Sequence, residues 1–143
     1  MGNWKSLILL LALIMLAGCT YSRDPSAGDE EIFEPKRLAI SHELQFDDIP
    51  VPVNFEYESK TSFIYKHENV RVGKLVYTGR EELFDVIRFY EENMPASGWG
   101  NGSTRQFGNI ANLHFEKQVE VAEITAQREG GHIIITIQVT PAK

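Results

Sequence analysis

One stretch with the periodicity of an amphipathic helix stands between two groups of strand-like segments, and this order constrains the fold more than any other feature. The apolar positions of that stretch recur at helical spacing: Leu83, Val86, Ile87, Tyr90 and Met94. Thr78 and Glu81 stand three residues apart, as in a capping box, and indicate where the helix begins. Pro95 lacks an amide donor and Gly98 tolerates a left-handed turn, so the helix is predicted to span residues 80–93.

The other regular segments are predicted to be β-strands. Residues 61–65 and 70–77 are rich in β-branched and aromatic side chains on either side of residues 67–69, which predicts an antiparallel hairpin. The apolar face of the second strand changes across Gly73, and a β-bulge at this glycine would explain the change. Further strands are predicted at residues 103–107, 111–117, 119–127 and 133–139, with a turn over residues 129–131.

This order of elements predicts an α+β fold. The expected architecture is an antiparallel β-sheet of about five to seven strands with one long α-helix packed on one face, a sandwich of two layers. Charged residues make up 24% of the chain and hydrophobic residues 43%, which are ordinary values for a globular protein. Cys19 is the only cysteine, so the domain must fold without disulfide bonds.

The beginning of the chain has the layout of an export signal. A basic residue precedes the apolar run at residues 7–15, which is too short for a transmembrane helix, since such a helix needs roughly 20 apolar residues. The next four residues, Leu16-Ala17-Gly18-Cys19, resemble the lipobox of bacterial lipoproteins. The resemblance implies that residues 1–18 are a signal peptide and that Cys19 is the lipidated N-terminus of the mature protein. Thr20 stands where an aspartate would retain a Gram-negative lipoprotein in the inner membrane, so an outer-membrane anchor facing the periplasm is expected.

A polar stretch follows the cysteine. Residues 19–48 contain proline, glycine and an acidic cluster but few large apolar side chains, which predicts a lipidated N-terminus and a flexible tether. As an alternative, residues 37–40 or 44–46 add an edge strand to the domain. A single α+β globular domain is predicted to span residues 49–143.

Two motifs of the globular part resemble a known group of proteins. The sequence VRVGKLVYTG at residues 70–79 matches a "VGxLxYxG" strand, and FYEENMPASGW at residues 89–99 matches a helix that ends in "FYxxxMPxxGW". Together with the LAGC lipobox, these motifs resemble an uncharacterised family of small lipoproteins from Gram-negative bacteria. The resemblance supports the fold and the location, and it implies no activity, substrate or catalytic residue.

Residue types that carry catalysis are present without the spacing that catalysis needs. The four histidines lack the spacing of a metal site, so no metal and no cofactor is expected: His42, His67, His114 and His132. No GxSxG or SxxK motif places a nucleophile beside a base, and Cys19 is consumed by lipidation. Glu116 and Glu120 are candidates for a glycosidase pair, but their alternation with Phe115 and Val121 is typical of a solvated face. The chain is therefore not expected to be an enzyme.

Phosphate groups and nucleic acids are not supported as ligands either. Gly98, Gly100 and Gly102 surround Trp99 without the strand-to-helix order of a phosphate-binding loop, so they are predicted to form a mobile surface loop. The chain has a net charge of −6, and its basic residues are dispersed among more numerous acids, which argues against a nucleic-acid partner.

Two functions remain open. The leading hypothesis is a non-catalytic interaction module, held at the membrane by its lipid, that docks on an envelope protein through an exposed sheet edge. The alternative is a periplasmic binder or carrier of a small molecule, lipid or glycan, with an apolar cleft between helix and sheet near Phe84, Phe89 and Trp99. These three residues form the candidate interaction surface, although Tyr90, Met94 and Trp99 also suit a role as packing anchors at the end of the helix.

Overall fold

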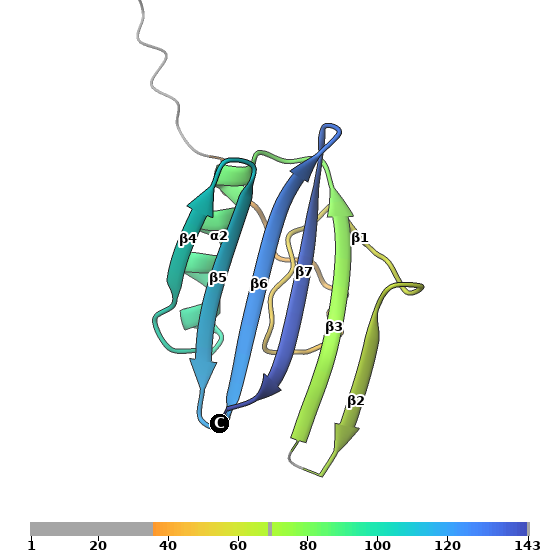
Figure 1. Cartoon of the computed structure of the whole chain (residues 1–143), viewed down its shortest axis with the longest axis vertical. Helices are drawn as coiled ribbons and strands as arrows, with labels where there is room; N and C mark the ends of the chain where they lie inside the picture. Colours follow the sequence, from red (N-terminus) through yellow and green to blue (C-terminus); the bar gives the residue numbers. More distant parts are fainter. Residues whose placement is uncertain (1–35, 69, 143) are drawn as a thin grey trace, which may run out of the picture. The chain divides into compact units, whose positions relative to one another are not determined.

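The computed structural model of the protein describes residues 36–68 and 70–142. Its strands, along which residues alternate between the core and the solvent, form one antiparallel sheet. The sheet of these residues has seven strands: β1 (Phe55–Tyr57), β2 (Phe63–His67), β3 (Val70–Gly79), β4 (Ser103–Phe107), β5 (Ile110–Lys117), β6 (Glu120–Glu129) and β7 (His132–Pro141). The helix α2 (Leu83–Ala96) lies between β3 and β4 in the sequence. The strands follow one another in space as β1-β3-β7-β6-β5-β4, and β2 pairs with β3 beside β1 (Figure 1).

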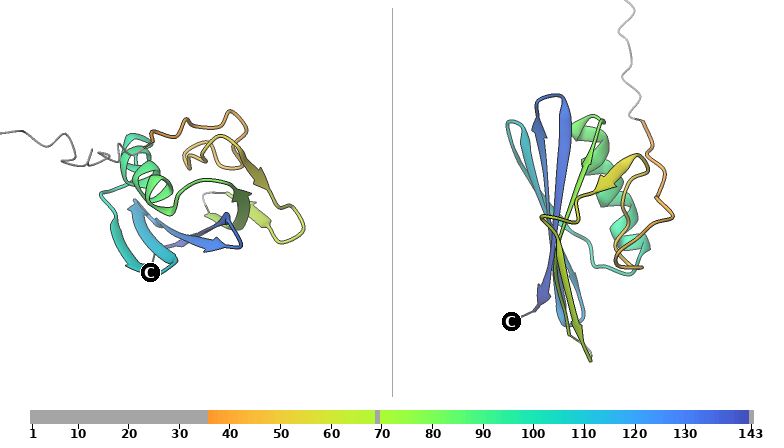
Figure 2. Two further views of the ribbon diagram at one scale, coloured as in Figure 1. Left: turned by 90° about the horizontal axis from the view of Figure 1, so that it is seen from above. Right: turned by 90° about the vertical axis from the view of Figure 1, so that its right-hand side faces the viewer.

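Two layers result, because α2 packs on one face of this sheet, over β5 and β6 (Figure 2). The prediction of an α+β two-layer sandwich is confirmed. The predicted hairpin of β2 and β3 and the later strands are also confirmed, including the turn at Gly130 and Gly131, whose φ angles are 55° and 83°. β1, which is three residues long, was not among the predicted strands.

The hydrophobic core lies between the sheet and α2. β7 contributes four fully buried side chains at alternate positions, which are Ile133, Ile135, Ile137 and Val139. Their cross-strand neighbours on β3 and β6 are buried on the same face, among them Leu75 and Ile124, and Leu113 and Phe115 of β5 continue this face beyond β6. From the helix, Val86, Tyr90 and Met94 enter this core, as their helical spacing predicts.

Residues 36–52 belong to the folded part of the chain, whereas the sequence suggested a tether up to residue 48. Phe46, Ile49 and Val51 are each 1% exposed and join the core, and Leu38 and Leu44 pack against it. This segment lies beside α2 on the same side of the sheet (Figure 2). It adds no edge strand, since its strand-like pairing is an isolated bridge between Ile40 and Pro52. The physical reason is that few but well-placed apolar side chains anchor a polar segment.

The helix begins three residues later than the capping-box pattern predicts. Thr78 cannot cap it, because this residue stays in β3 opposite Ile134 on β7. Glu82 takes the N-cap position with an extended backbone, and its side chain makes no capping hydrogen bond. The sheet pairing of β3 therefore determines where the helix can start.

At its other end, α2 continues through Pro95 to Ala96. A proline in the last turn removes one amide donor, and the amide of Ser97 still donates to the carbonyl of Asn93 at 3.0 Å. Gly98 then adopts a φ angle of 89°, which is the predicted left-handed turn.

β3 has no bulge at Gly73, which corrects the prediction. Gly73 pairs one-to-one with a residue of β2 and with a residue of β7. The apolar pattern changes because Phe46 covers the core side of Gly73, where an added Cβ would lie 3.1 Å from the ring atom Cζ. Val70 and Val72 belong to the opposite face of the sheet.

The predicted signal peptide, Cys19 and Thr20 lie outside the described residues. Within residues 36–68 and 70–142, no helix has both the length and the apolar character needed to span a membrane.

Candidate functional site

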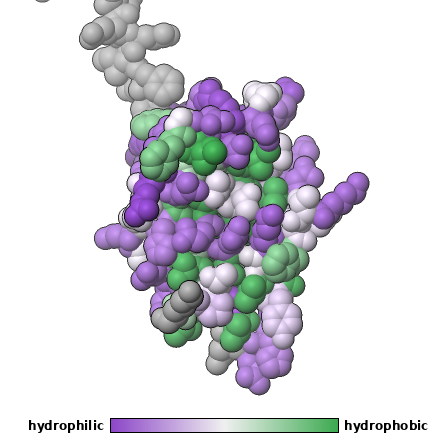
Figure 3. Space-filling view, in the orientation of Figure 1, coloured by the Kyte–Doolittle hydropathy of each residue, from purple (hydrophilic) through white to green (hydrophobic). Residues whose placement is uncertain are grey.

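The sheet face opposite α2 is open to solvent (Figures 1 and 2). Successive side chains of a strand point to opposite faces, so every second residue of the central strands reaches this open face. Figure 3 views it directly and shows hydrophilic residues across its middle, with hydrophobic residues between them and no single continuous apolar patch. The face is therefore suited to polar contacts more than to burial against a second apolar layer.

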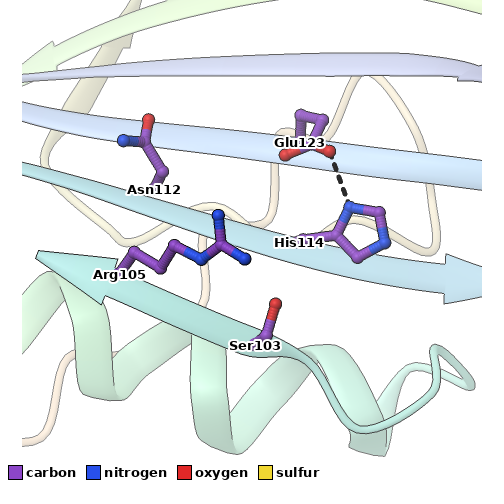
Figure 4. A pocket seen from close by; sticks show the side chains of 5 residues that line it. All are labelled: Ser103, Arg105, Asn112, His114 and Glu123. Atoms are coloured by element: carbon purple, nitrogen blue, oxygen red, sulfur yellow. Dashed lines mark hydrogen bonds and ion pairs between the residues drawn. The ribbon is translucent and has the colours of Figure 1, made fainter.

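A hollow on this face brings together side chains from three neighbouring strands (Figure 4). Its volume is about 290 Å³, and it is lined by Ser103, Arg105, Asn112, His114 and Glu123. A second hollow of about 540 Å³ shares Ser103 and His114 and extends to Asn101, Glu116 and Gln118. We call the two together the His114 groove.

The pairing of the strands explains why these residues meet. Ser103 on β4 lies opposite His114 on β5, and His114 lies opposite Glu123 on β6. One step along, Arg105 lies opposite Asn112. The groove is therefore a product of register, since its residues come from three separate strands.

His114 is held by two carboxylates. Its Nδ1 lies 2.6 Å from Oε1 of Glu123, and its Nε2 lies 3.1 Å from Oε1 of Glu116. The pKa of His114 is raised above 6.5, mainly by the hydrogen bond with Glu123 and secondly by the hydrogen bond with Glu116. Both ring nitrogens act as donors in the charged imidazolium, so this arrangement favours the protonated ring.

This geometry does not suit nucleophilic catalysis, although Ser103, His114 and Glu123 are the residue types of a catalytic triad. A general base needs a ring nitrogen that can accept the proton of the serine hydroxyl. Here the second ring nitrogen of His114 is bonded to Glu116, and the two carboxylates raise the pKa of His114, which favours the protonated ring over the neutral base. The groove can bind a ligand through hydrogen bonds, and it lacks an activated nucleophile.

The three residues of the candidate interaction surface occupy different environments. Phe84 is 51% exposed on α2. Phe89 is 3% exposed and packs edge-to-face on Tyr90, with the ring centroids 5.2 Å apart. Trp99 is 3% exposed, and its Nε1 donates to the backbone oxygen of Asp48 at 2.8 Å. Of the three, Phe84 alone reaches solvent, because residues 36–52 cover the side of the helix where a cleft was expected.

Little space remains on that side. The gap lined by residues 36–38 and Phe89 has a volume of about 10 Å³, which is room for about one water molecule. Among the described residues, Tyr77 Oη, Tyr90 Oη and Asp85 Oδ1 are buried without a hydrogen-bond partner. Burial, with a smaller contribution from Tyr57, raises the pKa of Tyr77 to about 12. Burial also raises the pKa of Tyr90, so both hydroxyls stay protonated.

A second charged cluster lies at the end of the sheet near Trp99. Arg71 donates to Asp48 Oδ1 at 2.7 Å and also to Glu120, and Lys117 donates to Asp48 Oδ2 at 2.7 Å. Burial would raise the pKa of Asp48, but the hydrogen bonds and charges of Arg71 and Lys117 outweigh it and hold this pKa at about 2. Because these charges compensate one another, the cluster fastens residues 46–48 to the sheet.

The suggested carboxylate pair does not form. Glu116 lies in the His114 groove, whereas Glu120 lies opposite Lys117 and bonds Arg71 on the other side of the sheet. In the part of the chain that the structure describes, no group of three His, Cys, Asp or Glu side chains is arranged to hold a metal ion.

The glycine-rich loop packs closely on β5. The amide of Gly100 donates to the carbonyl of Glu116 at 2.7 Å. A Cβ on Gly102 would lie 2.3 Å from the ring of Phe115, so only glycine fits there. The loop forms one wall of the groove, a role that the sequence did not indicate.

Of the groove residues, Ser103, Arg105, Asn112 and Glu123 were not identified from the sequence. The available signal was the run of polar residues at every second position of β4 and β5. Such a run also occurs on ordinary solvated strands, so it does not mark a site by itself.

Comparison with protein families gives a match to most of the folded part. A family model described as START domain-like matches residues 59–139. The match includes α2 and both sequence motifs, at residues 70–79 and 89–99. No curated protein and no solved structure matches the chain.

Proposed function

The chain belongs to the START domain-like family, and from this premise we propose that it is a non-catalytic ligand-binding module whose binding surface is the open face of the sheet. START-like domains are typically non-catalytic binding modules. The observation that carries the choice of surface is the His114 groove, in which polar side chains of three strands converge in contact with solvent. The opposite face of the sheet is filled by α2 and by residues 36–52.

The module acts in the bacterial cell envelope. Support for this part of the proposal comes from the sequence, in which an apolar signal is followed by LAGC and then by Thr20. Lipid on Cys19 anchors the protein to the outer membrane, and the folded part faces the periplasm. Several acyl chains together provide a stable anchor, since each buried methylene contributes about 0.8 kcal/mol.

A second candidate function, docking of an envelope protein, is favoured by strand β2. Phe63 and Tyr65 are 56% and 57% exposed, and the rings of Tyr65 and His67 stack 6.3 Å apart. Among the described strands β2 pairs with β3 alone, so its other edge can accept a strand from a partner.

Site-specific photocrosslinking in cells tests both functions. A photoreactive residue replaces Asn101 at the edge of the groove, Tyr65 on β2, or Glu92 on the outer surface of α2 as the matched control. Cys19→Ala provides the unanchored control for each position. Adducts from position 101 that disappear in the Cys19→Ala background are expected.

Adducts from position 65 with none from position 101 would favour protein docking over ligand binding as the function. An equal yield from position 92 would contradict the choice of surface. Membrane fractions that retain the Cys19→Ala protein would contradict the lipid anchor.

A further inference from the structure

We infer that the His114 groove binds a neutral, hydroxyl-rich oligosaccharide, and that this ligand lies along β4 and β5 with one sugar ring stacked on Phe107. The inference rests on the proposed function and names the ligand class of the same surface. Three observations support it: the balanced charge of the groove, its planar hydrogen-bonding side chains, and the exposed ring of Phe107, which follows Arg105 by two residues on the open face of β4.

The charges of the groove compensate one another. Glu116 and Glu123 provide two negative charges. Arg105 provides one positive charge, and His114 provides a second in the protonated form that its two carboxylate partners favour. An anionic ligand would approach two carboxylates, and a cationic ligand would approach a guanidinium and an imidazolium. A neutral ligand with many hydroxyl groups avoids this like-charge repulsion, and each hydroxyl can both donate and accept a hydrogen bond.

The side chains of the groove suit neighbouring hydroxyl groups. Amides, carboxylates and guanidinium groups are planar and present two hydrogen-bonding atoms side by side, as Asn112 and Arg105 do here. The hydroxyl of Thr125 donates to Oδ1 of Asn112 at 3.0 Å, which fixes the orientation of that amide. The two carboxylates fix the ring of His114 in the same way. The groove therefore offers a set of pre-oriented donors and acceptors.

Phe107 supplies the apolar contact that a sugar ring needs. It follows Arg105 by two residues on β4, so both side chains belong to the open face. Its side chain is 72% exposed, the largest exposure among the large hydrophobic residues of the described chain. The C–H face of a pyranose is apolar, and covering an exposed aromatic ring with it is favourable.

The length of the groove indicates an oligosaccharide. From Ser103 to Phe107 the strand extends roughly 13 Å at about 3.3 Å per residue, which is the length of about two to three sugar rings. The second hollow continues beyond Ser103 towards Asn101 and Gln118. Because the surface is shallow and open, the expected dissociation constant is on the order of 1 mM.

Saturation-transfer NMR on the full mature chain tests the inference. The protein is purified from membranes in a detergent without a sugar headgroup, such as lauryldimethylamine oxide. Chitotetraose and cellotetraose are the neutral probes, and a hyaluronan tetrasaccharide is the charged one. Binding of a neutral probe with a dissociation constant on the order of 1 mM is expected, with the charged probe at least about fivefold weaker. Preference for chitotetraose would indicate an acetamido-bearing glycan, and equal binding of both neutral probes would indicate recognition of hydroxyls alone.

Variants on one strand provide the matched comparison. Phe107→Ala and Asn112→Ala are each expected to weaken binding at least about fivefold. Gln106→Ala is the control, because this exposed residue lies between Arg105 and Phe107 on the other face of β4. Equal melting temperatures of the variants show that folding is intact.

Three results would overturn the inference: no saturation transfer to either neutral probe, tighter binding of the charged probe, or an equal effect of Gln106→Ala and Phe107→Ala. The crosslinking experiment separates this failure from failure of the proposed function. Crosslinks at position 101 without saccharide binding would leave the binding surface in place and reject the ligand class. Absence of both would reject the surface as well.

Discussion

Replacement of Phe46 by alanine tests whether residues 36–52 are part of the folded domain. Phe46 is 1% exposed, although it lies in a segment whose composition is that of a linker. Its ring packs against Gly73 of β3 and lies under two cations, since Lys66 Nζ and Arg71 Cζ are each 5.1 Å from the ring centroid. The alanine variant removes all of these contacts and leaves a cavity above β3.

The expected loss is large in relation to the stability of a small domain. A buried phenylalanine truncated to alanine costs about 3–5 kcal/mol, and loss of the cation contacts adds up to about 1 kcal/mol. The total free energy of unfolding of native proteins is about 5–15 kcal/mol. Phe46→Ala should therefore lower the melting temperature by more than about 10 °C.

Urea unfolding followed by tryptophan fluorescence provides the assay. The chain has two tryptophans, Trp4 and Trp99, so a protein that starts at residue 20 reports through Trp99 alone. Trp99 is 3% exposed, and its emission should shift when the core opens. The control is Val53→Ala, which removes a 40% exposed side chain close to the same segment and should cost less than about 1 kcal/mol. If Phe46→Ala costs no more than the control, residues 36–52 are a tether after all and the reasoning fails.

Two charged residues give the remaining predictions. The pKa of Asp48 is held at about 2 instead of 3.8, which corresponds to about 2 kcal/mol of folding stability at 1.36 kcal/mol per pKa unit. This stabilisation is complete above pH 3.8 and is lost as the pH falls towards 2. Asp48→Asn should reduce this acid sensitivity in urea unfolding, and an unchanged pH profile would contradict the role of the Asp48 cluster. The pKa of His114 is raised in the folded protein, so its contribution to folding stability is complete below pH 6.5 and is lost as the pH rises through the folded-state pKa. His114→Gln should flatten that alkaline loss, and an NMR titration of the wild-type imidazole at or below pH 6.5 would refute the paired-carboxylate geometry.

The fold was predictable because residues that face the core recur in the sequence at the period of their element, every second residue in a strand and every three to four residues in a helix. The alternation along β7 and the helical spacing from Leu83 to Met94 both reflect one buried face per element. Each of these patterns is local, and each was sufficient to assign the type of element and its inward face. The boundaries were less accurate, since Thr78 satisfied a capping pattern while its backbone remained paired in β3.

Residues 36–52 show where composition misleads. Three buried side chains, Phe46, Ile49 and Val51, are enough to fix a segment that is otherwise polar. Asp48 adds ion pairs to Arg71 and Lys117, and its backbone oxygen accepts the hydrogen bond of Trp99. None of these partners is near in the sequence, so no local pattern could indicate that the segment folds back onto the sheet.

The candidate site depends on register to a still greater degree. Ser103, His114 and Glu123 meet only because β4, β5 and β6 pair in one register. A shift of β4 by one residue would turn Arg105 and Phe107 towards the helix and bring Thr104 and Gln106 into the groove. Hydrophobic alternation along β5 fixes that strand's register through Leu113 and Phe115, but β4 has no buried side chain of its own to do the same. Its register is instead fixed by the close packing of Gly102 on Phe115 and by the hydrogen bond of Thr104 to Glu91 on α2. The glycine-rich loop and one polar contact on the helix side therefore determine which side chains face a ligand on the open side.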